Sequence, residues 1–417
     1  MTSSHTASAG LRWILLATAV AGAFGYVVQL LAPAFLSNSS YVSFSVTWSA
    51  VYLCVATMSG VQQEVSRAAR PSTDHPPNTV LRRFTVGASI VVVGASIVLG
   101  LVLGATTVPI NGFALALVLG IGLIGYLMTA VLGGVFYGLH LWRDAALLTV
   151  TDAALRVLLL GAALVLGLPP IWLACGIAFP FGLAFLLLWI VTRRRVVGRF
   201  ALDVSLPALS RNIMSTVGAA ACTGAMISGL PLIIGITAAQ EPATSLGAIM
   251  LAITLSRAPI VVPVLALQSF LISAVFRDRK HDPSRRVLGV LGLAILVILA
   301  LAALAAAAGP WLISVLSAGK YTIDAVTMAI ILVSAGLVAL LSITGAALVA
   351  RRQHSRNILG WAIAAALTVV GLLMPWDFAL RVNVALTVPA LLGLIVHVAG
   401  LLHRSVGGVP GSRNALG

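Results

Sequence analysis

Residues 170–195 read PIWLACGIAFPFGLAFLLLWIVTRRR, and this stretch decides the class of fold. Residues 170–192 carry no charge, and a helix of that length, rising ~1.5 Å per residue, can cross a hydrocarbon core of ~30 Å. Three arginines follow at once, a pattern typical of the cytoplasmic end of a membrane span. The stretch therefore predicts a transmembrane helix with a basic, cytoplasmic exit.

The rest of the chain repeats this pattern. Of its 417 residues, 60% are hydrophobic and 8% are charged, with a mean hydropathy of +1.11, whereas a soluble domain is roughly 25% charged. We therefore expect an all-α integral membrane protein of about twelve transmembrane helices, because helices satisfy their own backbone groups in lipid. Hydropathy places the spans at residues 11–35, 41–65, 84–107, 111–138, 144–167, 170–192, 213–237, 244–275, 286–308, 323–349, 357–375 and 380–402.

The cations lie almost entirely in alternate connections between the spans. In a soluble protein a formal charge of +15 would suggest nucleic-acid binding, but in short loops between apolar spans cations set orientation, so we expect no nucleic acid as a partner. By the positive-inside rule, the basic loops and both termini face the cytoplasm, in a multi-pass protein of the bacterial cytoplasmic (inner) membrane. The basic connections hold Arg67, Arg70, Arg82, Arg83, Arg143, Arg193, Arg194, Arg195, Arg199, Arg211, Arg277, Arg279, Lys280, Arg285, Arg286, Arg351, Arg352 and Arg356.

The same landmarks recur in the two halves of the chain. Arg67 and Arg277, which begin two basic exits, are 210 residues apart, as are Arg194 and Arg404. This repeat predicts two lobes of six helices with the same topology, related by an axis along the membrane normal. The expected division is an N-terminal lobe at 1–192, a cytoplasmic linker at 193–212, a C-terminal lobe at 213–404 and a cytoplasmic tail at 405–417.

Arg257 is the foremost candidate for a functional residue. It lies near the middle of the span at 244–275, too deep for its side chain to reach an interface easily. Pro259 and Pro263 follow it and can kink the helix. A guanidinium there suits an anionic headgroup, because it binds phosphate oxygens bidentately, but it could instead pair with a carboxylate or carbonyl and hold helices together.

Four further residues are candidates for substrate binding. Asp152 and Arg156 lie one helical turn apart on the same face. They could form a self-neutralising pair, or a pair that faces a cavity and binds substrate. Glu64, at the inner end of its span, and Arg12, at the start of the first span, could each be interfacial anchors or line a cavity mouth. The residues of the outer loops, Lys320, Asp324, Asp377 and Arg381, are expected to be solvated.

Other motifs carry no chemistry. The run Gly120–Gly125 matches the dinucleotide fingerprint in spelling, but it lies within an apolar span with no preceding strand, so its glycines are expected to let helices approach. No phosphate-cradling Gly-Lys loop occurs. The histidines form no cluster in the sequence and the three cysteines fall inside spans. We therefore expect no metal site, no cofactor and no catalytic activity.

Two stretches resemble a known family. Residues 41–67, YVSFSVTWSAVYLCVATMSGVQQEVSR, and 133–156, GGVFYGLHLWRDAALLTVTDAALR, look like the polysaccharide-transport branch of the multidrug/oligosaccharidyl-lipid/polysaccharide exporter superfamily, which includes O-antigen flippases. The resemblance implies a V-shaped pair of lobes around a cationic cavity that moves polyprenyl-pyrophosphate-linked glycans between leaflets. The family's cavity arginines correspond by position to Arg257. Many members have thirteen or fourteen spans, so twelve points to a shorter subgroup.

The leading hypothesis is a flippase for a lipid-linked oligosaccharide or related cell-envelope precursor, working by alternating access. Its partners would be a polyprenyl-linked glycan or other anionic lipid, membrane lipids and glycan-assembly enzymes. A cation- or proton-coupled multidrug exporter would need intramembrane carboxylates, and only Asp152 is a candidate. A glycosyltransferase or polymerase would need an acidic or arginine-rich outer loop, whereas the outer loops here are short and carry only Glu241, Asp324 and Asp377 as acids. A non-transporting assembly subunit stays open as a further alternative.

Overall fold

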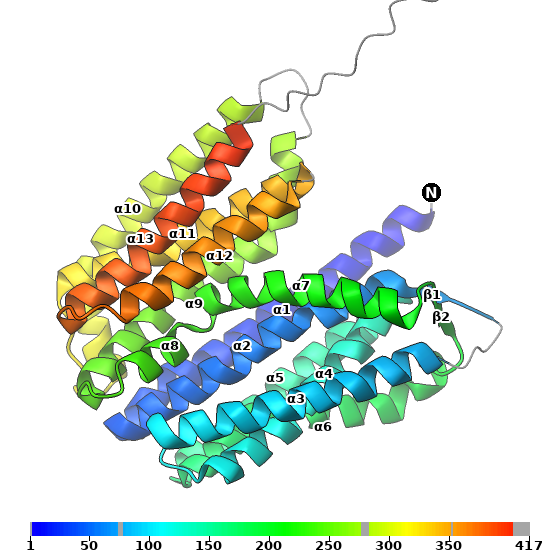
Figure 1. Cartoon of the computed structure of the whole chain (residues 1–417), viewed down its shortest axis with the longest axis horizontal. Coiled ribbons are helices and arrows are strands. Elements are labelled where there is room, and N and C mark those ends of the chain that lie inside the picture. The colour runs from blue at the N-terminus through cyan, green and yellow to red at the C-terminus, as the bar shows by residue number, and fades with distance from the viewer. Residues whose placement is uncertain (1, 74–77, 277–282, 352, 403–417) are drawn as a thin grey trace, which may run out of the picture.

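The chain folds into helices joined by short connections (Figure 1). The computed structural model describes residues 2–73, 78–276, 283–351 and 353–402. Eleven of the helices in these ranges are long and apolar enough to cross a bilayer, which confirms the all-α membrane class. The helices are α1 Thr2–Phe35, α2 Asn38–Ala68, α3 Thr79–Thr106, α4 Gly112–Gly138, α5 Trp142–Val165, α6 Pro170–Val196, α7 Leu206–Ile227, α8 Leu230–Thr237, α9 Ala243–Phe276, α10 Pro283–Leu316, α11 Ala325–Ala350, α12 His354–Leu372 and α13 Phe378–Leu402.

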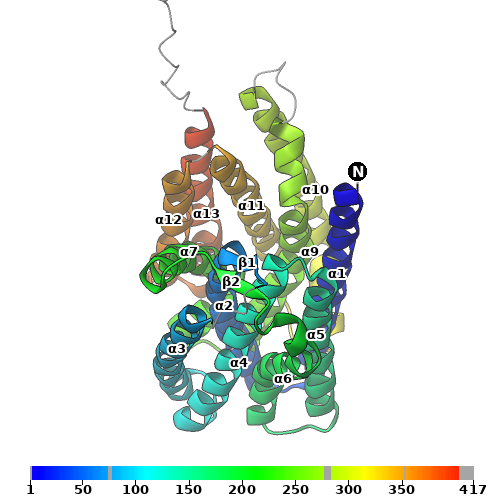
Figure 2. The ribbon, with the colours of Figure 1, turned by 90° about the vertical axis from the view of Figure 1, so that its right-hand side faces the viewer.

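The internal repeat is confirmed by the way the helices pack. In the first half α4 packs against α2, α3 and α6, and in the second half α11 packs in the same way against α9, α10 and α13. The first helix of each half also reaches the other half, because α1 contacts α9 and α7 contacts α2. Figures 1 and 2 show the two bundles, which diverge toward the end of the molecule where the strands lie.

A small antiparallel sheet joins two connections of the first half. Strand β1 (Ala69–Pro71) pairs with β2 (Phe200–Leu202), so that Arg70 lies opposite Ala201. The backbone N–H of Asp203 also donates to the carbonyl of Ala68 (3.1 Å). Hydropathy did not predict these strands, because each has only three residues. The sheet ties the end of α2 to the end of α6, and it occupies part of the predicted linker at 193–212.

The predicted span at 213–237 is not one continuous helix. It consists of α7, which begins at Leu206, and α8, and the two are bent by 71° at Ser228 and Gly229; counted as one span, they bring the total to twelve. The physical reason is local, since Pro231 in the first turn of α8 has no N–H to donate to a preceding turn. The predicted span is therefore present as a bent pair of helices, with a break that the hydropathy pattern did not predict.

Glycines allow α4 and α6 to approach closely, as expected for the run Gly120–Gly125. A Cβ atom at Gly125 would lie 2.6 Å from the backbone nitrogen of Gly182, a distance that packed atoms do not reach. Gly122 lies as closely against Ala178. The run therefore serves helix packing, and its place within α4 leaves no room for a nucleotide-binding loop.

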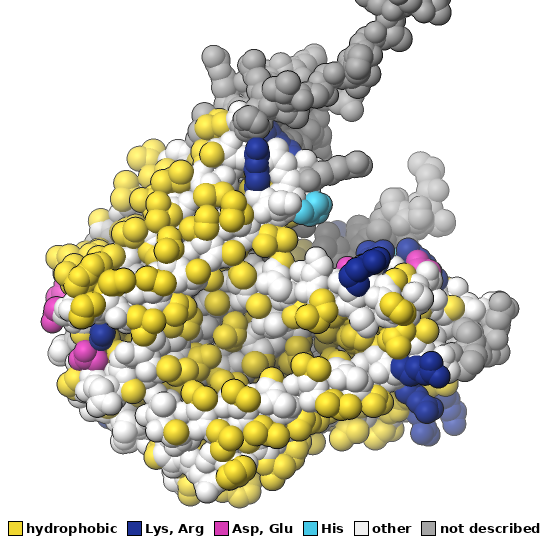
Figure 3. Space-filling view, in the orientation of Figure 1, with side chains coloured by type: hydrophobic (Ala, Val, Ile, Leu, Met, Phe, Trp, Pro, Cys, Tyr) yellow, Lys and Arg dark blue, Asp and Glu magenta, His cyan; other side chains and the backbone are white. Residues whose placement is uncertain are grey.

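Figure 3 shows Lys and Arg gathered on one face of the molecule at the end where β1 and β2 lie. This end, where the described arginines of the basic connections lie, is called the arginine-rich end below. That it faces the cytoplasm stays a prediction. Of the cations predicted there, Arg277, Arg279, Lys280, Arg352 and Arg404 lie outside the described residues.

The opposite end of the molecule corrects one expectation, because two of its cations are not simply solvated. The Nζ of Lys320 donates to the carbonyls of Ala34 (2.9 Å) and Leu36 (2.8 Å) at the end of α1. Arg381 pairs with Glu241 across 3.1 Å. The carboxylate of Asp324 accepts a hydrogen bond from Thr327 N–H at the start of α11, which holds the pKa of that carboxyl below its usual value.

Candidate functional site

Arg257 lies where the sequence placed it, in the middle of a membrane helix. It follows the first residue of α9 by 14 residues and precedes the last by 19. The residue is only 4% exposed. Among the residues that the structure describes, none offers a hydrogen-bond partner to any of its three guanidinium nitrogens. Burial of an unpaired cation is costly, so the alternative that Arg257 pairs with a carboxylate or carbonyl finds no support in this conformation.

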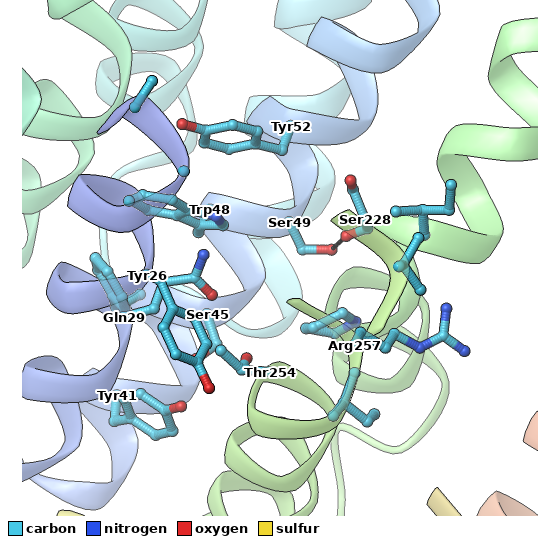
Figure 4. A pocket seen from close by; sticks show the side chains of 18 residues that line it. Tyr26, Gln29, Tyr41, Ser45, Trp48, Ser49, Tyr52, Ser228, Thr254 and Arg257 are labelled. Atoms are coloured by element: carbon cyan, nitrogen blue, oxygen red, sulfur yellow. Dashed lines mark hydrogen bonds between the residues drawn. The ribbon is translucent and has the colours of Figure 1, made fainter. Parts of the chain in front are cut away.

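Arg257 borders a cavity of about 250 Å³ between the two halves, called the central cavity below (Figure 4). The cavity lies where the first two spans of one half meet those of the other. Its walls come from α1, α2, the break between α7 and α8, and α9. The lining residues are Ala21, Gly22, Gly25, Tyr26, Gln29, Tyr41, Phe44, Ser45, Trp48, Ser49, Tyr52, Ile227, Ser228, Pro231, Ile253, Thr254, Arg257 and Val261.

The wall opposite Arg257 is aromatic and polar. The rings of Trp48 and Tyr52 stack on α2 with centroids 4.7 Å apart. From α1, the hydroxyl of Tyr26 donates to the carbonyl of Leu255 (3.5 Å), so the two halves touch across the cavity. Charge and motif patterns in the sequence did not single out these residues. One feature of the sequence did indicate a polar wall, because α2 has one of the lowest mean hydropathies among the spans, at 1.4.

The break in the seventh span is part of the cavity wall. The Ser49 hydroxyl donates to the Ser228 carbonyl (2.5 Å) and accepts from the Leu232 N–H (3.0 Å). These backbone groups flank the break and would otherwise lack partners inside the membrane. Irregular backbone at membrane depth is tolerated where it is buried in protein or lines a cavity, and this break does both.

Figure 4 also shows how the Arg257 side chain lies. Its alkyl chain borders the cavity, and its guanidinium extends away from Tyr26 and Gln29. The arginine side chain has several rotatable bonds, and within the described part of the chain no hydrogen bond holds the guanidinium of Arg257 in its present place. An anion that entered the cavity would therefore compete only with packing for this guanidinium, and not with a protein carboxylate.

Asp152 and Arg156 line a second cavity, of about 350 Å³, within the first half. Two hydrogen bonds join their side chains, the shorter being 2.7 Å. The guanidinium also lies over the rings of Phe181 (4.4 Å) and Tyr52 (5.5 Å). The pair is therefore both a self-neutralising staple and a cavity wall. Because Tyr52 lines both cavities, the second adjoins the central one.

The other two candidate residues lie apart from these cavities. Glu64 pairs with Arg67 one turn further along α2, across 3.0 Å. Arg12 is exposed and is the first residue of the membrane-spanning part of α1. Arg257 therefore lines the central cavity and the Asp152–Arg156 pair lines the adjoining one, whereas Glu64 and Arg12 lie in positions that suit interfacial anchors.

Within the described part of the chain, no group of three or more His, Cys, Asp or Glu side chains could hold a metal ion. The buried His397 is held by other groups, because its Nδ1 lies 3.0 Å from the Thr344 hydroxyl and its Nε2 lies 3.1 Å from the Asn357 carbonyl. These contacts account for His397 as a packing residue of the second half.

Sequence comparison places the chain among mycobacterial proteins. It is 30% identical over 402 residues to "Uncharacterized protein Rv1510" of Mycobacterium tuberculosis, covering 93% of this chain and 90% of the relative. It is also 30% identical over 408 residues to "Uncharacterized protein Mb3654" of Mycobacterium bovis, covering 95% and 92%. The chain belongs to the family of these proteins. No protein-family model matches it.

Solved structures of the same fold are membrane transporters. The "Lipid II flippase MurJ, inward closed conformation" superposes with a TM-score of 0.69 at 11% identity, covering 93% of this chain and 86% of that one. An inward-facing "multidrug resistance MATE family transporter of the MOP superfamily" superposes with a TM-score of 0.66 at 12% identity, covering 91% of this chain and 94% of that one. An outward-facing transporter of the same family superposes with a TM-score of 0.58 at 13% identity, covering 94% of each chain. The chain thus has the fold of the multidrug/oligosaccharidyl-lipid/polysaccharide exporter superfamily, as the sequence resemblance indicated.

Proposed function

We propose that this protein is a flippase that moves a polyprenyl-pyrophosphate-linked oligosaccharide, or a related cell-envelope precursor, across the cytoplasmic membrane by alternating access. The observation that carries the proposal is the buried, unpaired guanidinium of Arg257 at the edge of a cavity between the two halves. An anion that binds to a buried, unpaired cation stabilises it. A guanidinium can donate two parallel hydrogen bonds to phosphate oxygens.

The walls of the central cavity suit the glycan portion of such a substrate. Hydroxyl and amide groups from Gln29, Ser45 and Thr254 can hydrogen-bond to sugar hydroxyls. The faces of Trp48 and Tyr52 can stack against sugar rings. Polar and aromatic groups thus line the same cavity, as a glycan requires. The solved flippase with this fold acts on a lipid-linked substrate according to its name.

The sequence relatives support the proposed cellular location. A bacterial cytoplasmic membrane fits the mycobacterial family members. The partners would be the polyprenyl-linked glycan, the surrounding lipids and the enzymes that assemble the glycan. Chemistry on the substrate is not part of the proposal, since the cavity groups named above bind and do not form covalent bonds.

Export of cationic drugs is the second candidate, because solved structures of that class share the fold. It would require a carboxylate free to exchange a proton or cation. Asp152 is the candidate, but its two oxygens each accept a hydrogen bond from Arg156. An exporter mechanism would first have to break this pair, whereas anion binding at Arg257 breaks no ion pair.

The test is replacement of Arg257 in a strain that depends on this protein for its surface glycan. Arg257→Ala should lower glycan export about tenfold or more, the loss expected for charged hydrogen bonds worth about 1.5–3 kcal/mol. Arg257→Lys keeps the charge without the bidentate geometry and should retain intermediate export. Export would be measured as labelled glycan at the cell surface.

Stability and a matched control make this result specific. Because the replacement removes an unpaired buried charge, Arg257→Ala should unfold in detergent at the wild-type temperature or above it. Arg143→Ala removes an exposed arginine that stacks on Trp13 (5.5 Å), outside both cavities, and should export normally. Normal export by Arg257→Ala, or equal loss in both variants, would refute the proposal.

A further inference from the structure

A third cavity lies on the side of the first half that faces away from the central cavity. It has a volume of about 780 Å³ and is bounded by α3, α4, α6 and strand β2 at the arginine-rich end. We call it the lateral groove. Its lining residues are Asn78, Leu81, Arg82, Thr85, Val86, Met128, Val131, Leu132, Val135, Phe185, Trp189, Val196, Val197, Gly198 and Phe200.

The helix arrangement explains the groove. Helices α3 and α6 both pack on α4, which supplies the floor through Met128, Val131 and Val135. The segment that ends in β2 closes the groove near the membrane surface. Two of the bordering side chains are widely exposed, Val86 (58%) and Val197 (61%). A groove with an apolar floor and exposed apolar rims opens toward the acyl chains of the bilayer.

The charged rim of the groove indicates what binds there. Arg82 is the one charged residue of the lining, and it is exposed. Among the described residues, no hydrogen bond or ion pair engages its side chain. Arg83 and Arg199 lie exposed at the same end of the molecule. Clustered arginines beside a membrane surface attract anionic headgroups, by about 1 kcal/mol per cation.

Trp189 places the groove at the level of the interface. It lies in the last two turns of α6, four residues before Arg193. Tryptophan is enriched where the acyl region meets the headgroups. The groove therefore runs from the headgroup level at Arg82 into the hydrocarbon beside α4, which matches a lipid lying with its chain in the groove and its phosphate at the rim.

We propose that the lateral groove binds an anionic phospholipid from the leaflet at the arginine-rich end. One acyl chain lies on the floor formed by α4, and the phosphate lies against Arg82. This site is separate from the transport path, because α4 stands between the groove and the second cavity and supplies different residues to each. The proposal does not rest on the proposed function.

Lipid binding to the purified, full-length protein tests the proposal. Native mass spectrometry in mild detergent would follow titrations with phosphatidylglycerol and, separately, with phosphatidylcholine. The wild type should bind one phosphatidylglycerol several-fold more tightly than phosphatidylcholine. Arg82→Gln should weaken phosphatidylglycerol binding about fivefold, and Arg143→Gln, which removes an exposed arginine of α5 outside the lining, should leave it within about twofold.

A second variant tests the acyl-chain part of the site. Val131→Trp fills the floor of the groove and should weaken binding of both lipids, while the elution profile of the protein stays that of the wild type. Phosphatidylglycerol with brominated chains should quench part of the tryptophan fluorescence of the wild type. That part of the quenching should be absent from Trp189→Phe. Equal affinity of the wild type for the two lipids, equal loss in the two arginine variants, or undiminished binding by Val131→Trp would overturn the proposal.

Discussion

The Ser49 hydroxyl joins two segments that are about 180 residues apart in the sequence, because it bonds to Ser228 and to Leu232 on the two sides of the helix break. Nothing in the sequence around Ser49 distinguishes it from Ser59, whose hydroxyl bonds within its own helix to Ala56 (2.6 Å). Arg257 could be predicted because a charge inside an apolar run stands out by itself. A hydroxyl gains its role only from a partner that the fold supplies.

Replacement of Ser49 by alanine should destabilise the protein by about 1–3 kcal/mol, because the Ser228 carbonyl and the Leu232 N–H would both lose their hydrogen-bond partner at the helix break. Ser59→Ala removes the same atom from the same helix and should change the stability by less than about 0.5 kcal/mol. The thermal unfolding midpoint in detergent measures both. Equal midpoints for the two variants would show that the break does not depend on Ser49.

At the scale of the element, hydropathy predicted the existence of the spans but not their internal form. The long apolar runs that became α4, α6 and α11 had lengths and boundaries close to those observed, because burial in lipid depends on composition over a whole helix. The break after α7 and the three-residue strands depend on single backbone groups, which an average over many residues cannot detect.

The contact between α4 and α6 gives the element-scale prediction. Gly125→Leu would place a side chain against the backbone of Gly182, so the helices must separate, and we expect a loss of about 3 kcal/mol or more. Gly94→Leu, in α3, meets nothing within 4 Å and should be tolerated. The yield of monodisperse protein and its unfolding midpoint would compare them. A stable Gly125→Leu protein would contradict this view of the α4–α6 contact.

At the scale of the whole molecule, the two halves diverge at the arginine-rich end and meet at the other (Figure 1). Lys320, from the second half, holds the end of α1, and the rings of Tyr41 and Tyr321 meet beside it with centroids 5.7 Å apart. Alternating access would require these contacts to break.

Lys320→Met should therefore shift the molecule toward the state that is open at this end. The Nζ of Lys320 donates three hydrogen bonds to carbonyls at the end of α1, which have no partner within that helix. If their loss costs the closed state ~1.4 kcal/mol, the open population rises about tenfold. Ser45→Cys, in a chain whose three cysteines are replaced, would report this opening through its rate of labelling by a membrane-impermeant thiol reagent.

The matched control is Arg381→Met, which removes another cation from the same end of the molecule. Arg381 pairs with Glu241 within the second half, so its loss breaks no contact between the halves. Labelling of Ser45→Cys should accelerate about tenfold with Lys320→Met and little with Arg381→Met. Equal rates in the two variants would mean that Lys320 only caps α1, and that closure of this end depends on other contacts, foremost the packing of Tyr41 against Tyr321.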